Sequence, residues 1–321
     1  MFVLGLNGSP RRRGNNNYLL SLFMDKAEKK GFSTHTVHAA FESYEPCIGC
    51  GYCEKKGVCS IKDSLAHDLF SLMRKADVIV LATPVYFYGV PARIKGIIDR
   101  IQTLWSRKYR LGLKDPGADH RRGILLSVGA THGNNLFDGI RLTTRYFFDA
   151  MDCSFADELC YPGIDDRGAI GKHPGVVDDV KHLADKVLTP LQHRKRILFA
   201  CRENAGRSQM AAGFARQLAG DAYDVISAGS SPAREINPMA VAAMAQKGID
   251  IAFNVPCSMD DALAQGTVEC IVTMGCGESC PFIPGCRVVD WDLSDPAGEP
   301  LEVVCRIRDE ISTRVKALLD V

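Results

Sequence analysis

The sequence predicts an α/β protein of two domains, each built on a doubly wound parallel sheet. Its 321 residues correspond to about two domains at roughly 150 residues each. Short apolar runs alternate with amphipathic stretches in both halves, which is typical of a parallel sheet covered by helices on both faces. The same order begins again after a basic cluster at residues 193–196. We therefore expect one domain at residues 1–192 and another at residues 193–321.

Composition indicates an ordinary folded chain. It is 46% apolar and 24% charged, close to the globular average. Because 39 basic and 38 acidic residues leave a net charge of +1, no overall field favours nucleic acid or an anionic membrane as a partner. No basic leader precedes the first apolar run, and no apolar run reaches 18 residues. We expect neither a signal peptide nor a membrane span, and hence a cytoplasmic protein.

In each half, apolar runs predict strands and amphipathic stretches predict helices. In the first half we expect strands at residues 2–6, 77–84 and 123–130, with helices at 15–30, 137–150 and 176–191. In the second half we expect strands at 196–200, 223–227 and 268–274, with helices at 208–218, 238–247 and 301–319.

The first strand of each half leads through a loop rich in Gly, Asn, Ser and Arg into a helix. Such a loop presents backbone N–H groups and the positive end of a helix dipole to an anion. Neither loop is a Walker A sequence, and no G-x-G-x-x-G follows a strand. The sequence thus disfavours nucleoside triphosphates and a Rossmann-bound dinucleotide.

The first of these loops contains no cysteine. Ser9, Arg11 and the amides near residues 14–16 can surround a phosphate without attacking it, which suits a bound cofactor. After the strand at 77–84, residues 84–87 can line a planar ring at the carboxyl end of the sheet. Taken singly, either segment is equally compatible with an ordinary loop.

Together, GSPRRRGNN, TPVYFYGVPA and GATHGNN resemble the NADPH-dependent FMN reductase family of flavodoxin-like proteins, over roughly residues 1–190. The resemblance implies FMN, with NAD(P)H as electron donor and a homo-oligomer formed through this domain. Asn16 stands where the family often has Thr. The implied FMN-binding residues are Ser9, Arg11, Asn15 and Asn16 near the phosphate, Pro84, Val85, Tyr86 and Phe87 beside the ring, and Gly129, Thr131, His132 and Gly133 on its other side.

The cysteines suggest thiol chemistry. Thirteen among 321 residues are about 4%, fewer than the roughly 8–10% of secreted disulfide scaffolds, and their number is odd. Cys47, Cys50, Cys53 and Cys59 form a C-x2-C-x2-C-x5-C run. Four thiols within thirteen residues resemble the compact ligation of an iron–sulfur cluster, and the spacing is similar to that of the iron–sulfur flavoproteins. We favour a [4Fe–4S] cluster; zinc or uncoordinated thiols are the alternatives.

The second loop, CRENAGRSQ, opens with a thiol. In this C-x5-R-S pattern the loop amides and Arg207 enclose an oxyanion, while Arg207 and the helix that begins near Ser208 favour the thiolate of Cys201. A thiolate at this point can attack phosphorus or arsenic. Asn204 can adopt the left-handed conformation that such a loop needs.

This pattern resembles the low-molecular-weight protein tyrosine phosphatase superfamily over residues 195–321. Gln209, where phosphatases typically have Pro, and a DP element without the usual tyrosines favour its arsenate reductase branch. The resemblance implies Asp295 as general acid and Cys276 with Cys280 as a redox pair. It also implies arsenate or a phosphate-like oxyanion as substrate, and thioredoxin or a small thiol as reductant. The short C-x3-C spacing and Gly206 depart from some thioredoxin-linked members.

The prediction is an oxidoreductase that joins an FMN-binding, iron–sulfur flavoprotein domain to an arsenate reductase. A low-molecular-weight phosphatase fused to a flavin reductase is the main alternative, and a non-enzymatic sensor of oxyanions or thiols is another. Cys276 and Cys280 are also compatible with a structural role.

Overall fold

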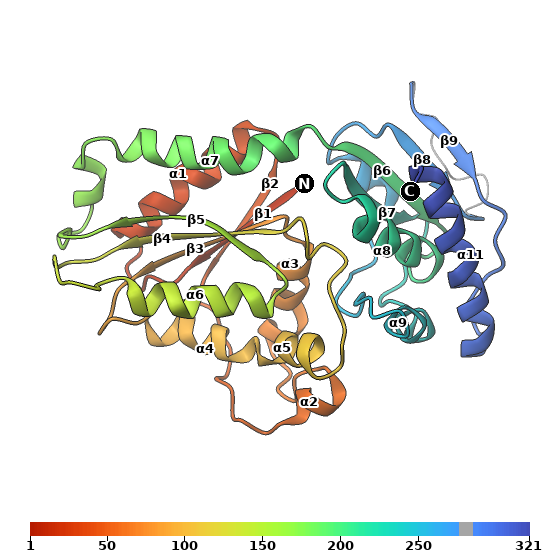
Figure 1. Ribbon diagram of the computed structural model, residues 1–321, viewed down its shortest axis with the longest axis horizontal. Helices are drawn as coiled ribbons and strands as arrows, with labels where there is room; N and C mark the ends of the chain where they lie inside the picture. The colour runs from red at the N-terminus through yellow and green to blue at the C-terminus, as the bar shows by residue number, and fades with distance from the viewer. Residues whose placement is uncertain (276–284) are drawn as a thin grey trace. The chain divides into compact units, whose positions relative to one another are not determined.

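Two parallel sheets, one in each half of the chain, organise the protein (Figure 1). The computed structural model describes residues 1–275 and 285–321, the side chain of residue 67 excepted. One unit comprises Met1–Gly112 and His120–Gln192, and the other comprises Leu113–Asp119 and His193–Val321. The predicted fold class, two parallel-sheet α/β domains, is confirmed. Within the described ranges, no helix is both long and apolar enough to cross a bilayer.

The first unit has a five-stranded sheet in the order β2-β1-β3-β4-β5. Its three central strands are almost entirely buried, whereas the edge strands β2 and β5 carry polar, partly exposed residues. The elements are β1 (Phe2–Asn7), α1 (Asn15–Lys29), β2 (Ser33–His38), α2 (Tyr52–Lys56), a π-helical turn (Leu65–Leu69), α3 (Phe70–Lys75), β3 (Val78–Pro84), α4 (Ala92–Arg100), α5 (Gln102–Tyr109), β4 (Arg122–Val128), α6 (Asp138–Ala150), β5 (Ser154–Tyr161), a 3-10 turn (Ala169–Lys172) and α7 (Val176–Gln192).

Helices cover both faces of this sheet. Helices α1 and α7 lie on one face, and α4, α5 and α6 lie on the other (Figure 1). Leu19 and Phe23 of α1 and Leu188 of α7 pack with Val80 and Leu126 in one buried cluster. The carboxyl ends of β1, β3 and β4 therefore lie side by side at one edge of the sheet, with a loop leaving each of them.

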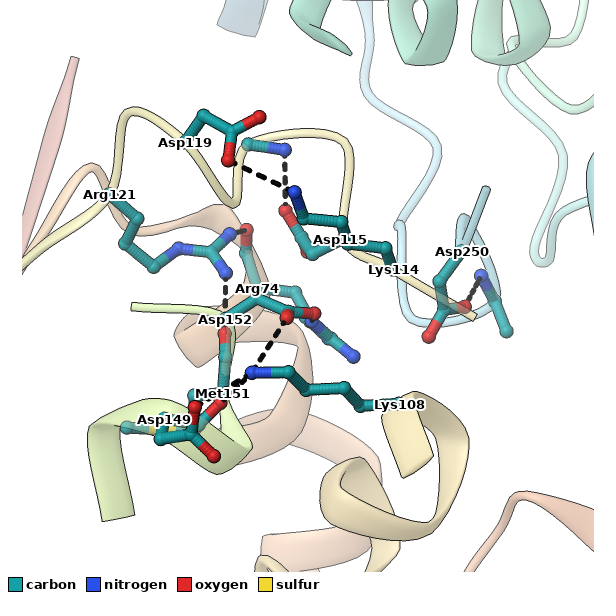
Figure 2. A network of polar contacts seen from close by, with 12 residues as sticks. Arg74, Lys108, Lys114, Asp115, Asp119, Arg121, Asp149, Met151, Asp152 and Asp250 are labelled. Carbon is teal, nitrogen blue, oxygen red and sulfur yellow. Dashed lines mark hydrogen bonds and ion pairs between the residues drawn. The ribbon is translucent and has the colours of Figure 1, made fainter. Parts of the chain in front are cut away.

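A network of charges fixes α5 within the first unit (Figure 2). Lys108 of α5 pairs with Asp149 at 2.9 Å and with the buried Asp152 at 3.4 Å. Asp152 also pairs with Arg74 at 3.3 Å, and the Arg121 guanidinium donates to the carbonyls of Met151 and Arg74. Because α5 borders the cysteine segment, this network helps to position the surface on which those cysteines rest.

The second unit has a four-stranded parallel sheet in the order β7-β6-β8-β9. Helices α8, α9 and α11 pack on one face, around Phe199 and Val272, and α10 packs on the other, around Leu198 and Ile271. The elements are β6 (Lys195–Cys201), α8 (Arg207–Ala219), β7 (Tyr223–Gly229), α9 (Pro238–Ala245), α10 (Met259–Leu263), β8 (Cys270–Thr273), β9 (Arg287–Asp290) and α11 (Leu301–Leu319).

A short segment from the first half of the sequence also belongs to the second unit. Lys114 forms a parallel β-bridge with Ile249. Its N–H donates to the Gly248 carbonyl at 2.8 Å, and its carbonyl accepts from the Asp250 N–H at 2.9 Å. Lys114 also pairs with Asp119 at 3.0 Å (Figure 2). The second unit is thus completed by residues that lie about eighty positions before it in the chain.

Candidate functional site

In the second unit, the loop between β6 and α8 encloses the Cys201 thiol. Cys201 ends the buried strand β6 and is only 3% exposed. Its Sγ accepts a hydrogen bond from the Asn204 N–H at 3.2 Å and lies 3.0 Å from Ser208 Oγ. Since α8 begins at Arg207, the helix N-terminus also faces this loop.

Asn204 adopts the left-handed conformation predicted for it, with φ near 50°. Its side chain is fully buried and donates through Nδ2 to Ser208 Oγ at 2.8 Å. The turn directs the Asn204 N–H at the sulfur, as an anion-binding loop requires.

Arg207 connects the loop to the expected general acid. Its guanidinium donates to the Leu293 carbonyl at 3.2 Å and pairs with the Asp295 carboxylate at 3.4 Å. Asp295 is 62% exposed, so its carboxyl group is accessible from solvent. The structure therefore brings together five predicted residues: Cys201, Asn204, Arg207, Ser208 and Asp295.

Glycines allow close packing around this loop. A Cβ on Gly206 would lie 2.8 Å from Pro296 Cγ, and a Cβ on Gly229 would lie 2.6 Å from the Arg202 carbonyl. Gly206, which departs from some relatives, thus allows the loop to pass next to the segment that carries Asp295. These two glycines were not predicted as site residues, because nothing in the local sequence shows what packs against them.

The predicted redox pair, Cys276 and Cys280, lies outside the described residues. The preceding residue, Gly275, is described: it has φ near 67°, and a Cβ there would lie 2.9 Å from Arg207 Nη1. The chain leading to Cys276 therefore starts beside the guanidinium of the loop.

In the first unit, the loop between β1 and α1 follows the same plan with a hydroxyl in place of a thiol. Asn7 Oδ1 accepts the Ser9 N–H at 2.9 Å, and Ser9 Oγ accepts the Arg11 N–H at 3.2 Å. Ser9 is buried, whereas Arg11 is exposed at the loop surface. Gly14 caps α1, so the helix N-terminus opens on this loop.

The side chains of Asn15 and Asn16 are engaged by the protein backbone. Asn15 donates to the Asp166 carbonyl at 3.0 Å and accepts from the Gly168 N–H at 2.8 Å. Asn16 Oδ1 accepts from the Val128 N–H at 3.0 Å. Both amides thus join the loop to neighbouring segments, and the Ser9 hydroxyl, the exposed Arg11 and the backbone N–H groups lie on the same loop.

The two other predicted FMN-binding segments meet at the same sheet edge. Tyr86 and Gly89 exchange two backbone hydrogen bonds in a tight turn after β3, which leaves the Phe87 side chain fully exposed. A Cβ on Gly133, in the loop after β4, would lie 3.0 Å from the Tyr88 hydroxyl. Beside that loop is an open cavity of about 280 Å³, whose lining includes His132, Gly133 and Pro162. The remaining predicted positions, Pro84, Val85, Gly129 and Thr131, lie on these two segments.

The four clustered cysteines lie on an irregular surface segment and the short helix α2. Cys47 and Cys50 are exposed, Cys53 and Cys59 are half-buried, and all four thiols are free. A hydrogen bond with Ser60, together with the Tyr52 backbone amide, lowers the pKa of Cys50. Cys53 Sγ accepts a long hydrogen bond from Ser106 at 3.6 Å.

The donor set suits an iron–sulfur cluster, but the thiols are not gathered around one point. Within the described ranges, no three side chains of ligand type lie close enough together to hold a metal ion. The segment is held instead by Arg100, which pairs with Asp63 at 2.8 Å and donates to the Glu45 carbonyl at 2.7 Å. Burial opposes ionisation of Asp63, yet the hydrogen bonds from Arg100 and from backbone amides outweigh it and lower the pKa of this carboxyl.

The first unit is thus an α/β unit with a polar loop at a helix N-terminus, and the second is an α/β unit with a buried thiol in a similar loop; comparison with known proteins identifies the family of each. Residues 1–135 match the family described as NADPH-dependent FMN reductase. Residues 196–321 match the family described as low molecular weight phosphotyrosine protein phosphatase.

Individual relatives agree with these matches. An iron–sulfur flavoprotein of Methanocaldococcus jannaschii is 33% identical over 147 residues, which are 46% of this chain and 72% of the relative. Arsenate reductase 2 of Staphylococcus epidermidis is 35% identical over 126 residues, which are 39% of this chain and 95% of the relative. Among solved structures, a thioredoxin-dependent arsenate reductase of Corynebacterium glutamicum is 30% identical with a TM-score of 0.35, and the match covers 46% of this chain and 75% of that one.

The first half of the chain therefore belongs to the FMN reductase family, with iron–sulfur flavoproteins as relatives, and the second half belongs to the low molecular weight phosphatase family, with arsenate reductases as relatives. It is an oxidoreductase. It spans 46 to 72% of the lengths of the iron–sulfur flavoproteins that it matches.

Proposed function

We propose that residues 193–321 reduce arsenate to arsenite, with Cys201 as nucleophile. The observation that carries this proposal is the closed loop: Cys201 Sγ accepts the Asn204 N–H, and Arg207 lies between the loop and Asp295. The Cys201 thiolate displaces one arsenate oxygen, Asp295 protonates it, and it leaves as water. Arg207 and the loop amides hold the remaining oxygens.

The redox step transfers one electron pair. The Cys276 thiolate attacks Cys201 Sγ and forms a disulfide, while the S–As bond breaks and its electron pair leaves with arsenite. Cys280 then attacks Cys276, which returns Cys201 as a thiolate and leaves a Cys276–Cys280 disulfide. A thiol donor, either thioredoxin or a small thiol, restores the pair. Arsenic gains two electrons and two thiols lose two, so the step is balanced.

For residues 1–192 we propose FMN binding at Ser9, Arg11 and the loops after β3 and β4, with NAD(P)H as electron donor. Bound FMN would supply two-electron redox chemistry at this sheet edge. Cys47, Cys50, Cys53 and Cys59 would ligate a [4Fe–4S] cluster, for which the donor chemistry is right even though the thiols are not gathered. Anaerobic purification with iron and sulfide analysis tests the cluster separately from the flavin.

The two activities fit together because a hydride, a flavin and a disulfide each exchange two electrons. We propose that the first half supplies the electrons that reduce the disulfide of the second. Arsenate-dependent NAD(P)H oxidation without added thiol tests this, with Cys201→Ser as the control that leaves the first half unaltered. Complete dependence on an added thiol donor would show that the halves work separately.

Phosphate monoester hydrolysis is the second candidate, because Cys201, Arg207 and Asp295 serve equally well for attack on phosphorus. Gln209 and the Cys276/Cys280 pair favour arsenate. Rapid aryl phosphate hydrolysis, with no arsenate-dependent loss of thiols, would select the phosphatase. A homo-oligomer formed through the first half and a cytoplasmic location stay predictions; light scattering on the purified chain tests the former.

A further inference from the structure

A continuous chain of polar side chains runs from the edge of the second unit to the Cys201 thiol. Asn254 Nδ2 donates to Gln209 Oε1 at 2.9 Å. Gln209 Nε2 donates to the Asn204 backbone carbonyl and to Asn204 Oδ1, each at 3.1 Å. Asn204 Nδ2 donates to Ser208 Oγ at 2.8 Å, and Ser208 Oγ lies 3.0 Å from Cys201 Sγ.

Each hydrogen bond in this chain of side chains determines which atom of the next side chain donates and which accepts. Because Gln209 uses its amide nitrogen on both Asn204 oxygens, its own oxygen must face Asn254. Asn204 Oδ1 also accepts the Cys257 N–H at 2.8 Å, so Asn204 Nδ2 must face Ser208. Ser208 Oγ accepts this bond, and its hydroxyl hydrogen is then available for donation to the sulfur 3.0 Å away.

Burial favours one orientation of these side chains over the flipped alternatives. Asn204 and Ser208 are fully buried and Gln209 is 2% exposed, so a wrongly oriented amide would leave polar atoms without partners. Asn204 also has the left-handed backbone that most residues other than glycine, asparagine and aspartate avoid. The two bonds from Gln209 hold this residue by its carbonyl and by its side chain at once.

We propose that Gln209 and Asn254 are positioning residues for the nucleophile. Through Asn204 and Ser208 they direct two hydrogen-bond donors, the Asn204 N–H and the Ser208 hydroxyl, at Cys201 Sγ. These donors stabilise the thiolate before any oxyanion binds. This inference rests on the proposed role of Cys201 as nucleophile, but it does not depend on whether the oxyanion is arsenate or phosphate. Gln209 therefore has a physical role beyond separating reductases from phosphatases in sequence.

The test is the rate at which iodoacetamide alkylates Cys201 in the full chain as a function of pH, followed by mass spectrometry of the Cys201 peptide. We expect Gln209→Leu to shift the profile upward by roughly half to one pH unit, which is about a three- to tenfold lower rate on its acidic side. Gln265→Leu is the matched control, because it removes an amide that donates to the nearby Asp261 carbonyl and takes no part in the bonds to Asn204. The control should leave the profile unchanged.

A double-mutant cycle separates positioning from general stability. Asn254→Leu should give a smaller shift in the same direction, and the double variant should match Gln209→Leu alone, because Asn254 acts only through Gln209. Additive shifts, or an unchanged profile in Gln209→Leu or Asn254→Leu protein that melts like the control, would overturn the inference. If Gln209→Leu does not fold, Asn254→Leu still decides the question. Since alkylation uses neither arsenate nor phosphate, failure of the proposed reaction would appear separately.

Discussion

The loops β1–α1 and β6–α8 share one backbone plan but enclose different groups. In both, a buried strand ends in a loop that leads to a helix N-terminus, and an asparagine directs the turn: Asn7 in the first and Asn204 in the second. The first loop encloses the Ser9 hydroxyl and keeps Arg11 exposed. The second encloses the Cys201 thiol and keeps Arg207 buried beside Asp295.

The difference shows which features bind an anion and which transform it. Backbone N–H groups and a helix dipole suffice to hold a phosphate, and both loops offer these. A reaction needs in addition a nucleophile on the loop and an acid opposite it. The second loop carries the Cys201 thiol and an arginine paired with Asp295, whereas the first loop has no cysteine. The comparison therefore supports the proposal of a bound cofactor at the first loop and a consumed substrate at the second.

The largest expected effect is loss of the thiol. We expect Cys201→Ser to lower arsenate turnover with a small-thiol reductant by roughly 10³-fold or more, as for other enzymes that lose their nucleophile. FMN content of the same protein should not change. Ser9→Cys in the Cys201→Ser protein adds a thiol to the first loop and should not restore turnover, because within the described ranges no ion pair like Arg207–Asp295 is formed by the arginines of that loop. Restored turnover would break the comparison.

The next effect concerns the cofactor loop. Arg11→Ala should weaken FMN binding by about 10- to 100-fold, the worth of a hydrogen bond to a charged group. The matched control is Arg12→Ala, since Arg12 instead stacks on the Phe41 ring at 4.3 Å. Flavin fluorescence titration measures the affinity. Equal losses for the two variants would mean that general positive charge, and not the loop geometry, holds the phosphate.

Much of what separates the two loops, and most of the fold around them, could be predicted from the sequence. The buried strands, the principal helices, the C-x5-R-S loop and the left-handed Asn204 were predicted, because apolar runs and short spacings are local signals. The residue ranges of strands β2, β5 and β9 were not, because STHTVH, SFADELCY and RVVD lie at sheet edges and are too polar to stand out. Long-range partners were also missed: the bond from Asn16 to Val128 joins residues 112 positions apart, and the Lys114–Ile249 bridge joins still more distant ones.

The hydrogen bond that Asn16 accepts from the Val128 N–H leads to a stability prediction. Asn16→Ala should leave the buried Val128 N–H without its acceptor and lower the free energy of unfolding by about 1–3 kcal/mol. Asn16→Asp, which keeps an acceptor oxygen, should lose less. Urea denaturation of the flavin-free protein measures both. If Asn16→Ala weakens FMN binding but leaves stability unchanged, Asn16 contacts the phosphate and the notion of a purely structural asparagine is wrong.

The smallest expected effect concerns the segment that carries Cys47, Cys50, Cys53 and Cys59. The ion pair between Arg100 and Asp63 holds this segment, whereas side-chain amides hold the two loops. Asp63→Asn keeps an oxygen for Arg100 but removes the charge, so it should lower the free energy of unfolding by about 1 kcal/mol at pH 7.

The folded protein lowers the pKa of Asp63, which means that the unfolded chain takes up a proton first as pH falls. The charge contribution is therefore complete above the unfolded value of about 4 and disappears as pH falls through the folded value. Urea denaturation from pH 7 to pH 2.5 should show the stabilities of wild type and variant converging at the acidic end. A difference that stays constant over the whole range would mean that Asp63 acts through packing and hydrogen bonding alone, and that the segment bearing the four cysteines is not held by charge.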